Sequence, residues 1–155
     1  MNAYRARSNS IAWPPIIALA AIVLSVLAGF VISLPFPHGP AFRSVGVLVL
    51  LGVVAIDLWS VLTLRAAHTT VLPMRKSTNL VTTGPFGLSR NPIYIANILL
   101  LLALALILGN AWFVVFAATT AVGMQKFAVE REELHLLAVF GAEYEAYCRR
   151  VRRWL

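Results

Sequence analysis

A polar stretch over residues 78–94 carries side chains that could bind an anion. Gly84-Pro85 favours a sharp turn, because glycine and proline permit backbone angles that suit turns. Asn91-Pro92 predicts the start of a helix, with asparagine as the N-cap and proline at the first helical position. The free N–H groups of that helix attract anions, and Arg90 adds a positive charge beside them. The stretch would suit a carboxylate or phosphate, although a basic turn that contacts lipid headgroups would have the same spacing.

A second polar stretch holds most of the acidic side chains. Five of the six acids lie between Glu130 and Glu145. Carboxylates there could receive ribose hydroxyls or an ammonium group, and they would sit close to a sulfonium cation. The alternative is a solvated helix face on which Lys126 and Glu130 pair four residues apart. The two stretches could form one binding site only if this stretch and residues 78–94 lie close together in the folded protein.

The composition indicates what kind of molecule holds these two stretches. Hydrophobic residues make up 60% of the 155 residues and charged residues only 12%. A soluble domain is usually about 25% charged, so the surplus apolar surface must face lipid. The net charge of +7 comes from basic residues that flank apolar segments, and we therefore expect no nucleic-acid partner. The single cysteine, Cys148, excludes an internal disulfide and a cysteine cluster for zinc.

Four apolar segments are candidates for membrane-spanning helices, for which about 20 residues are needed. They run over residues 11–34, 45–64, 93–108 and 111–127, and a polar helical tail follows over 129–155. The proline-rich residues 35–40 and the pair Gly109-Asn110 predict the turns between them. We therefore predict an all-α membrane protein with about four transmembrane helices and a single domain over residues 1–155.

The loop charges orient this bundle. The amino end, the loop over residues 65–91 and the tail hold nearly all the lysines and arginines, whereas the loop over residues 35–44 has only Arg43. The positive-inside rule then predicts an integral membrane protein with both termini in the cytoplasm. The 65–91 loop and the tail, which carry the candidate chemistry, fall on that same side.

Taken together, the two stretches resemble the isoprenylcysteine carboxyl methyltransferases and the phospholipid methyltransferases. The first motif is Leu80-Val81-Thr82 with Gly84-Pro85-Phe86, followed by Arg90-Asn91-Pro92 and Tyr94. The second motif is Glu132-Glu133 followed by leucine, then Phe140-Gly141, Tyr144 and Tyr147. The order of the motifs and the short hairpin between them are also similar. The resemblance covers roughly residues 65–153.

The resemblance implies an enzyme that transfers a methyl group from S-adenosylmethionine to a lipophilic or membrane-embedded acceptor. The cofactor pocket and its cap would be built from the loop, the start of the third span and the C-terminal helical tail. The residues assigned to the cofactor are His68, Thr78, Asn79, Leu80, Val81, Phe86, Asn91, Pro92, Tyr94, Glu132 and Glu133. Those assigned to catalysis are Arg90, Tyr94 and Glu132. One in-line displacement needs no metal, so we expect none.

Two positions depart from the pattern of these families. Many members have histidine where this chain has Asn91, and asparagine cannot act as a base at neutral pH. The prenylcysteine enzymes place a substrate-binding arginine where this chain has Ala128. The prenylcysteine carboxylate is therefore in doubt as the acceptor. A phospholipid amine, a prenylated thiol-acid and a small hydrophobic thiol or amine all stay open.

A non-catalytic membrane protein, such as a small transporter, is the alternative. Asp57 lies within the second span and Asn97 lies one turn beyond Tyr94, so both could line a pathway or pair with other helices. A transporter should gather its polar residues near the middle of the bilayer. Here they gather in a loop and a tail, which favours the enzyme. Surrounding membrane lipids are the expected partners, and the sequence pattern leaves the oligomeric state open.

Overall fold

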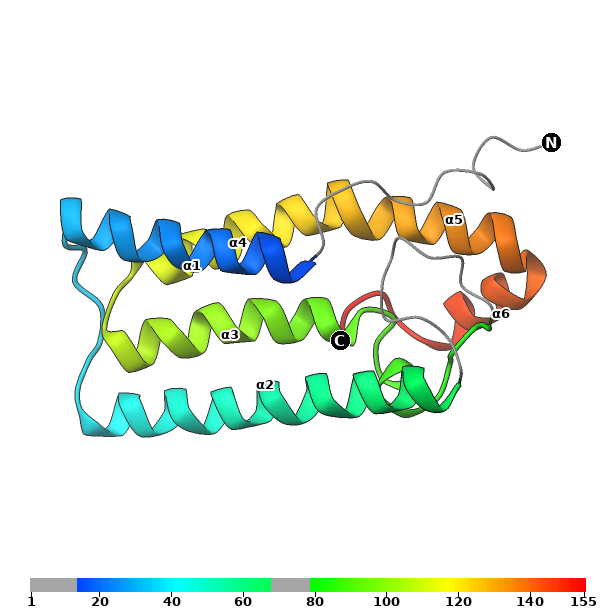
Figure 1. Ribbon diagram of the computed structural model, residues 1–155, viewed down its shortest axis with the longest axis horizontal. Coiled ribbons are helices and arrows are strands. Elements are labelled where there is room, and N and C mark those ends of the chain that lie inside the picture. The colour runs from blue at the N-terminus through cyan, green and yellow to red at the C-terminus, as the bar shows by residue number, and fades with distance from the viewer. Residues whose placement is uncertain (1–13, 68–78) are drawn as a thin grey trace.

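The computed structural model describes residues 14–67 and 79–155, and these residues form a helical bundle (Figure 1). The predictions for His68 and Thr78 fall outside the described residues. The helices are α1 (Pro14–Val31), α2 (Pro40–Ala66), the short 3-10 helix η2 (Gly84–Gly87), α3 (Pro92–Leu108), α4 (Trp112–Met124), the π-helical segment η3 (Gln125–Val129), α5 (Glu130–Phe140) and α6 (Ala142–Arg150). The all-α prediction is confirmed for this part of the chain.

Two helices are long and apolar enough to cross a membrane. They are α2 and the continuous helix Trp112–Phe140, whereas α1 and α3 are shorter apolar helices. The helix predicted over 45–64 begins earlier, because Pro40 occupies the first helical position, where its missing N–H costs nothing. Most large side chains of α1 and α2 are exposed hydrophobics, including Leu19, Leu27, Leu51 and Leu58. An apolar exposed surface of this kind suits contact with lipid.

The fourth predicted span does not end where the apolar residues end. The helix predicted over 111–127 continues through the π-helical segment η3 into α5, so that the acidic residues lie on the same rod as the apolar ones (Figure 1). The residues between Gly123 and Gly141 include no glycine or proline that would break the helix. Gly141, with φ at 52°, ends the rod and lets α6 turn back.

Helix α3 lies in the middle of the bundle, with α2 along one side and α4 along the other, and α1 packs on α4 (Figure 1). The buried residues of α2 are Gly46, Val53 and Ser60, which are spaced seven residues apart. This stripe faces α3 so closely that a Cβ on Gly46 would stand 2.9 Å from the carbonyl oxygen of Ala103. Small residues therefore allow the two backbones to approach.

The two short connections meet at one end of the bundle. Pro35 forms an isolated bridge with Asn110, and the Trp112 indole donates to the carbonyl of Ile32 at 2.7 Å. The loop that contains η2 and the helix α6 lie toward the other end, and the chain then returns so that the C-terminus lies beside the start of α3 (Figure 1). The two polar stretches identified in the sequence therefore share one end of the molecule.

Candidate functional site

The loop before α3 is fixed to the end of α2. The side-chain amide of Asn79 donates to the carbonyl of Ala67 at 2.9 Å. Gly84 has a φ of 60°, and a Cβ at this position would stand 2.8 Å from Oγ1 of Thr63. Glycine is therefore required both by the backbone angle and by the close approach of α2. The described part of the loop, residues 79–91, is therefore held against the C-terminal end of α2.

Tyr94 and Glu132 meet across 38 residues of sequence. The Tyr94 hydroxyl donates to Oε2 of Glu132 at 3.0 Å. Tyr94 lies in the first turn of α3 and is only 7% exposed, and Glu132 lies in the first turn of α5 and is partly buried. Ala128 and Val129 are buried in the same cluster as the tyrosine. The pair is thus a phenol and a carboxylate set against an apolar wall, an arrangement that can accept a cationic ligand.

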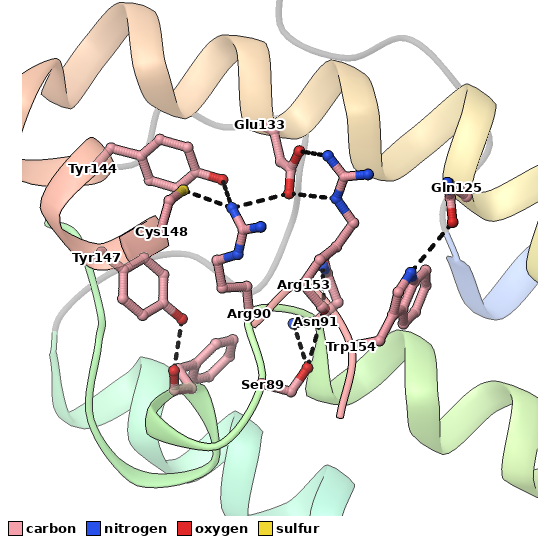
Figure 2. Close-up of polar contacts among 11 residues, drawn as sticks. Ser89, Arg90, Asn91, Gln125, Glu133, Tyr144, Tyr147, Cys148, Arg153 and Trp154 are labelled. Carbon is pink, nitrogen blue, oxygen red and sulfur yellow. Dashed lines mark hydrogen bonds and ion pairs between the residues drawn. The ribbon is translucent and has the colours of Figure 1, made fainter. Parts of the chain in front are cut away.

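Glu133 lies between two guanidinium groups (Figure 2). Arg90 Nη1 is 3.1 Å from Oε1 of Glu133. Arg153 approaches both carboxylate oxygens, with Nε 3.0 Å from Oε1 and Nη2 2.6 Å from Oε2. This bidentate geometry is the strong form of the arginine–carboxylate pair. The hydrogen bonds to Glu133 raise the pKa of Arg153 above the ordinary arginine value, so Arg153 stays charged.

Arg90 also reaches α6. Its Nη1 lies 3.5 Å from the Tyr144 hydroxyl and within hydrogen-bond distance of Cys148 Sγ (Figure 2). Burial, together with the negative charge of Glu133, raises the pKa of the Tyr144 phenol, which therefore stays neutral. The Arg90 side chain is only 13% exposed, so its charge is balanced mainly by Glu133.

A second tyrosine joins α6 to the loop. The Tyr147 hydroxyl donates to the carbonyl of Phe86 at 2.6 Å (Figure 2). Burial raises the pKa of Tyr147, so the phenol keeps the proton that this hydrogen bond requires. Phe86 lies in η2, so this hydrogen bond connects the first motif to Tyr147 at the end of the second motif.

Asn91 precedes the first residue of α3, as predicted, but its side chain makes a different bond from the one expected. No side-chain hydrogen bond caps the helix, and Nδ2 of Asn91 instead donates to the carbonyl of Arg153 at 3.0 Å. The helix start is formed by the backbone, since the Asn91 carbonyl accepts from the N–H of Ile95. The C-terminal segment captures the amide because it lies directly against the loop, and Pro92 is buried beside it.

A pocket of about 540 Å³ opens beside Arg90 and Glu133, between α5 and α6. Its wall combines Glu130 and Glu145 with Arg149, and Leu134 and Leu137 add an apolar part. Tyr94 and Glu132 are not among the residues that line it. Successive residues of a helix point about 100° apart, so Glu132 and Glu133 serve two different faces of α5.

The structure brings most of the predicted residues to one end of the bundle. Tyr94 contacts Glu132, and Arg90 contacts Glu133. Asn79, Phe86 and Asn91 are fixed by the bonds described above, and Leu80 and Val81 are half-buried in the same loop. Sequence reasoning did not assign Ser89, Gln125, Cys148, Arg153 or Trp154 to the site, although these residues bond to its parts (Figure 2). The arginines near the C-terminus were used only to orient the bundle, and nothing in their spacing singled out Arg153.

The two polar residues of the transporter alternative lie within the helices. Asn97 donates to the carbonyl of Ile93, one turn back in α3, rather than to another helix. Oδ1 of Asp57 is buried without a hydrogen-bond partner among residues 14–67 and 79–155, and the ion pairs found there do not include Asp57. Most polar contacts that join separate segments in the described part of the chain gather instead at the end of the bundle that holds α6 (Figure 2).

Comparisons with known proteins found relatives that match part of this chain. The nickel-cobalt-cadmium resistance protein NccN of Alcaligenes xylosoxydans is 37% identical over 76 residues, which are 49% of this chain and 35% of that protein. The chain thus matches about a third of the length of that relative. An uncharacterized protein of Haemophilus influenzae is 42% identical over 65 residues, which are 41% of this chain and all of that protein. No solved structure gave a significant match.

The family model that matches is that of the phospholipid methyltransferases, over residues 42–143. The match begins near the start of α2 and includes the first motif and the second motif as far as Gly141; it ends before Tyr144 and Tyr147. Because the match covers more than half of the chain, the chain belongs to the phospholipid methyltransferase family.

Proposed function

We propose that this protein transfers the methyl group of S-adenosylmethionine to a lipophilic acceptor that reaches the site from the membrane. The observation that carries the proposal is the 3.0 Å hydrogen bond between Tyr94 and Glu132. The bond joins the two motifs that the sequence separates, one on each side of the α3–α4 hairpin. Membership of a methyltransferase family gives the reaction class, and this contact suggests where the reaction takes place.

For the membrane arrangement, we propose four spans in one domain over residues 1–155, with both termini on the cytoplasmic side. Two helices have the length of a full span, and the exposed apolar surface of α1 supports a lipid-facing position for that shorter helix as well. The site would then lie at the cytoplasmic face, where a water-soluble cofactor can enter. The acceptor would approach from the lipid between helices.

The residues at this end fit S-adenosylmethionine, which carries a sulfonium, an ammonium and a purine. Glu132 offers a carboxylate to a cationic or hydroxyl group of the cofactor, and Tyr94 holds that carboxylate in place. The apolar cluster with Ala128 and Val129 suits the uncharged part of the ligand. We propose that main-chain groups of residues 79–81 and the ring of Phe86 also contact the cofactor, and that Thr78 and His68, which lie outside the described residues, contribute as well.

When bound, S-adenosylmethionine supplies a methyl group that an acceptor can take in one displacement. The chain's own part is to align donor and acceptor and to exclude water. Glu132 would stabilise positive charge near the reacting centre, since a carboxylate in a low-dielectric wall interacts strongly with a cation. Arg90 balances the charge of Glu133, so that the neighbouring carboxylate does not add a second negative charge to the site.

The buried position of Ala128 is relevant to which chemical group of the acceptor receives the methyl group. Ala128 is 2% exposed and is packed with Met124 and Val129. The alanine side chain offers no positive charge to a substrate carboxylate, which supports an acceptor that carries an amine or thiol. Asn91, whose amide is engaged by the C-terminal segment, supplies no base, so the proton of the acceptor would leave by another route.

The proposal is tested by a methyl-transfer assay on the purified protein in nanodiscs. Labelled S-adenosylmethionine is supplied together with a membrane lipid extract, and the labelled product is then identified. Calorimetry with S-adenosylmethionine on the same sample measures cofactor binding separately. Label in a lipid-soluble product is expected, and absence of cofactor binding in nanodiscs and in several detergents would rule the proposal out.

A further inference from the structure

The last residues of the chain cross back over the site. Helix α6 ends at Arg150, and Val151 adopts extended backbone angles. The N–H of Arg90 donates to the carbonyl of Arg152 at 2.9 Å. The hydroxyl of Ser89 and the amide of Asn91 both donate to the carbonyl of Arg153, at 3.2 and 3.0 Å. Three consecutive loop residues are therefore bonded to two consecutive carbonyls of the tail.

The side chains of the same segment reach two other parts of the site. Arg153 makes the bidentate pair with Glu133 on α5 (Figure 2). The Trp154 indole donates to Oε1 of Gln125 at 3.2 Å and packs against the buried cluster that contains Tyr94. Residues 152–154, which we term the C-terminal strap, thus bond to the loop, to α5 and to η3.

The contacts of the strap also fix the orientation of a carboxylate next to the proposed cofactor-binding residue Glu132. Glu133 is held by Arg90 from the loop and by Arg153 from the strap, and the next residue, Glu132, holds Tyr94. Two guanidiniums fix the orientation of one carboxylate more narrowly than one would, because Arg153 is bidentate. Because these two arginines hold Glu133, helix α5 cannot rotate freely about its axis, and Glu132 is kept in a defined position.

We propose that Arg153 is a positioning residue, which through Glu133 and the strap carbonyls holds the loop and α5 in the geometry that binds the cofactor. The expected effect of Arg153 on the KM for S-adenosylmethionine rests on the proposed function. The structural part of the inference, that the strap holds the loop at Arg90, can be measured without any activity. Residues 152–154 lie beyond the region matched by the family model, which ends at residue 143.

The test compares Arg153→Met, Arg153→Lys and the control Arg150→Met in nanodiscs. Arg150 is exposed and belongs to the same basic cluster, so Arg150→Met removes an equal charge without touching Glu133. We expect Arg153→Met to raise the KM for S-adenosylmethionine on the order of tenfold while kcat changes little, because a charged hydrogen-bonded pair is lost outside the reacting centre. Arg153→Lys should recover part of the loss, and Arg150→Met should match the unmodified protein.

Hydrogen exchange provides the readout that does not depend on catalysis. The amide of Arg90 is bonded to the strap, so a peptide that contains it should exchange faster in Arg153→Met and at the normal rate in Arg150→Met. Normal KM and normal exchange in Arg153→Met would overturn the inference, as would equal effects of the two methionine variants. If the unmodified protein binds no cofactor, the proposed function fails, and the exchange comparison alone decides whether the strap holds the loop.

Discussion

Helix α2 and the polar end of the bundle are built on opposite principles. The buried residues of helix α2 form one narrow stripe of Gly46, Val53 and Ser60, and much of its remaining surface is exposed and apolar. The polar end is joined by ion pairs and by hydrogen bonds between segments distant in sequence, such as the hydrogen bond from Tyr147 to Phe86. The first region depends on the closeness of two backbones, and the second depends on the chemistry of individual side chains.

The difference predicts how each region responds to substitution. In α2 a single added methyl group should matter where the backbones touch and should be tolerated one or two turns away. At the polar end the volume of a side chain should matter less than its ability to donate or accept a hydrogen bond. A carboxylate or phenol removed there leaves a buried partner without its bond, which costs more than the bond itself contributed.

The largest effect is expected for Glu132→Ala. The substitution removes the carboxylate that the Tyr94 hydroxyl contacts and that we assign to the cofactor. We expect the affinity for S-adenosylmethionine to fall roughly 100-fold, since a hydrogen-bonded charge in a partly buried site is lost. Calorimetry in nanodiscs measures the change. Glu143→Ala, which removes an exposed acid of the same charge, is the control, and a normal affinity in Glu132→Ala would remove our main site assignment.

The next largest effect is expected in helix α2, where alanine substitutions at two glycines should change the stability differently. A Cβ at Gly46 would stand 2.7 Å from Ile107 and 2.9 Å from the Ala103 carbonyl, whereas a Cβ at Gly52 would meet no atom within 4 Å. Gly46→Ala should therefore lower the free energy of unfolding by about 2 kcal/mol through overpacking. Gly52→Ala should leave it unchanged or raise it by up to about 1 kcal/mol through helix propensity. Denaturant unfolding in mixed micelles compares the two, and equal effects would contradict the close packing of α2 on α3.

The smallest effect is expected for Tyr147→Phe and carries a pH signature. Loss of the bond to the Phe86 carbonyl should lower the free energy of unfolding by about 1 kcal/mol. An unfolded tyrosine ionises near pH 10, whereas burial keeps Tyr147 protonated to higher pH in the folded state. The unfolded state therefore gains charge first, and stability that is complete below pH 10 is lost as the pH rises further.

The measurement for Tyr147 is a series of unfolding curves from pH 8 upward. The decline in stability above about pH 10 should be shallower in Tyr147→Phe than in the unmodified protein, because one of the responsible phenols is gone. Tyr144 remains in the variant and preserves part of the decline, since burial also raises its pKa. An identical decline in both proteins would show that Tyr147 is not shielded from water as its position suggests.

Much of the fold could be predicted because it follows from local patterns. Asn91-Pro92 places the start of α3 where the structure has it, and Gly109 ends that helix with a φ of 65°. The family was identified from motifs whose backbone requirements are local, such as Gly84-Pro85-Phe86, and the family match confirms it. The continuation of the fourth helix to Phe140 was not predicted, because a change from apolar to charged residues was interpreted as the end of an element, although helix formation does not require apolar residues.

The sequence by itself determined where the apolar helices lie along the chain, their apolar character and the two motifs, since each depends on residues a few positions apart. Only the tertiary structure decided which of four clustered arginines holds Glu133 and which acceptor takes the amide of Asn91. The physical reason is that a hydrogen bond depends on position within a few tenths of an ångström, and the position of the strap depends on how α5 and α6 fold back on the loop.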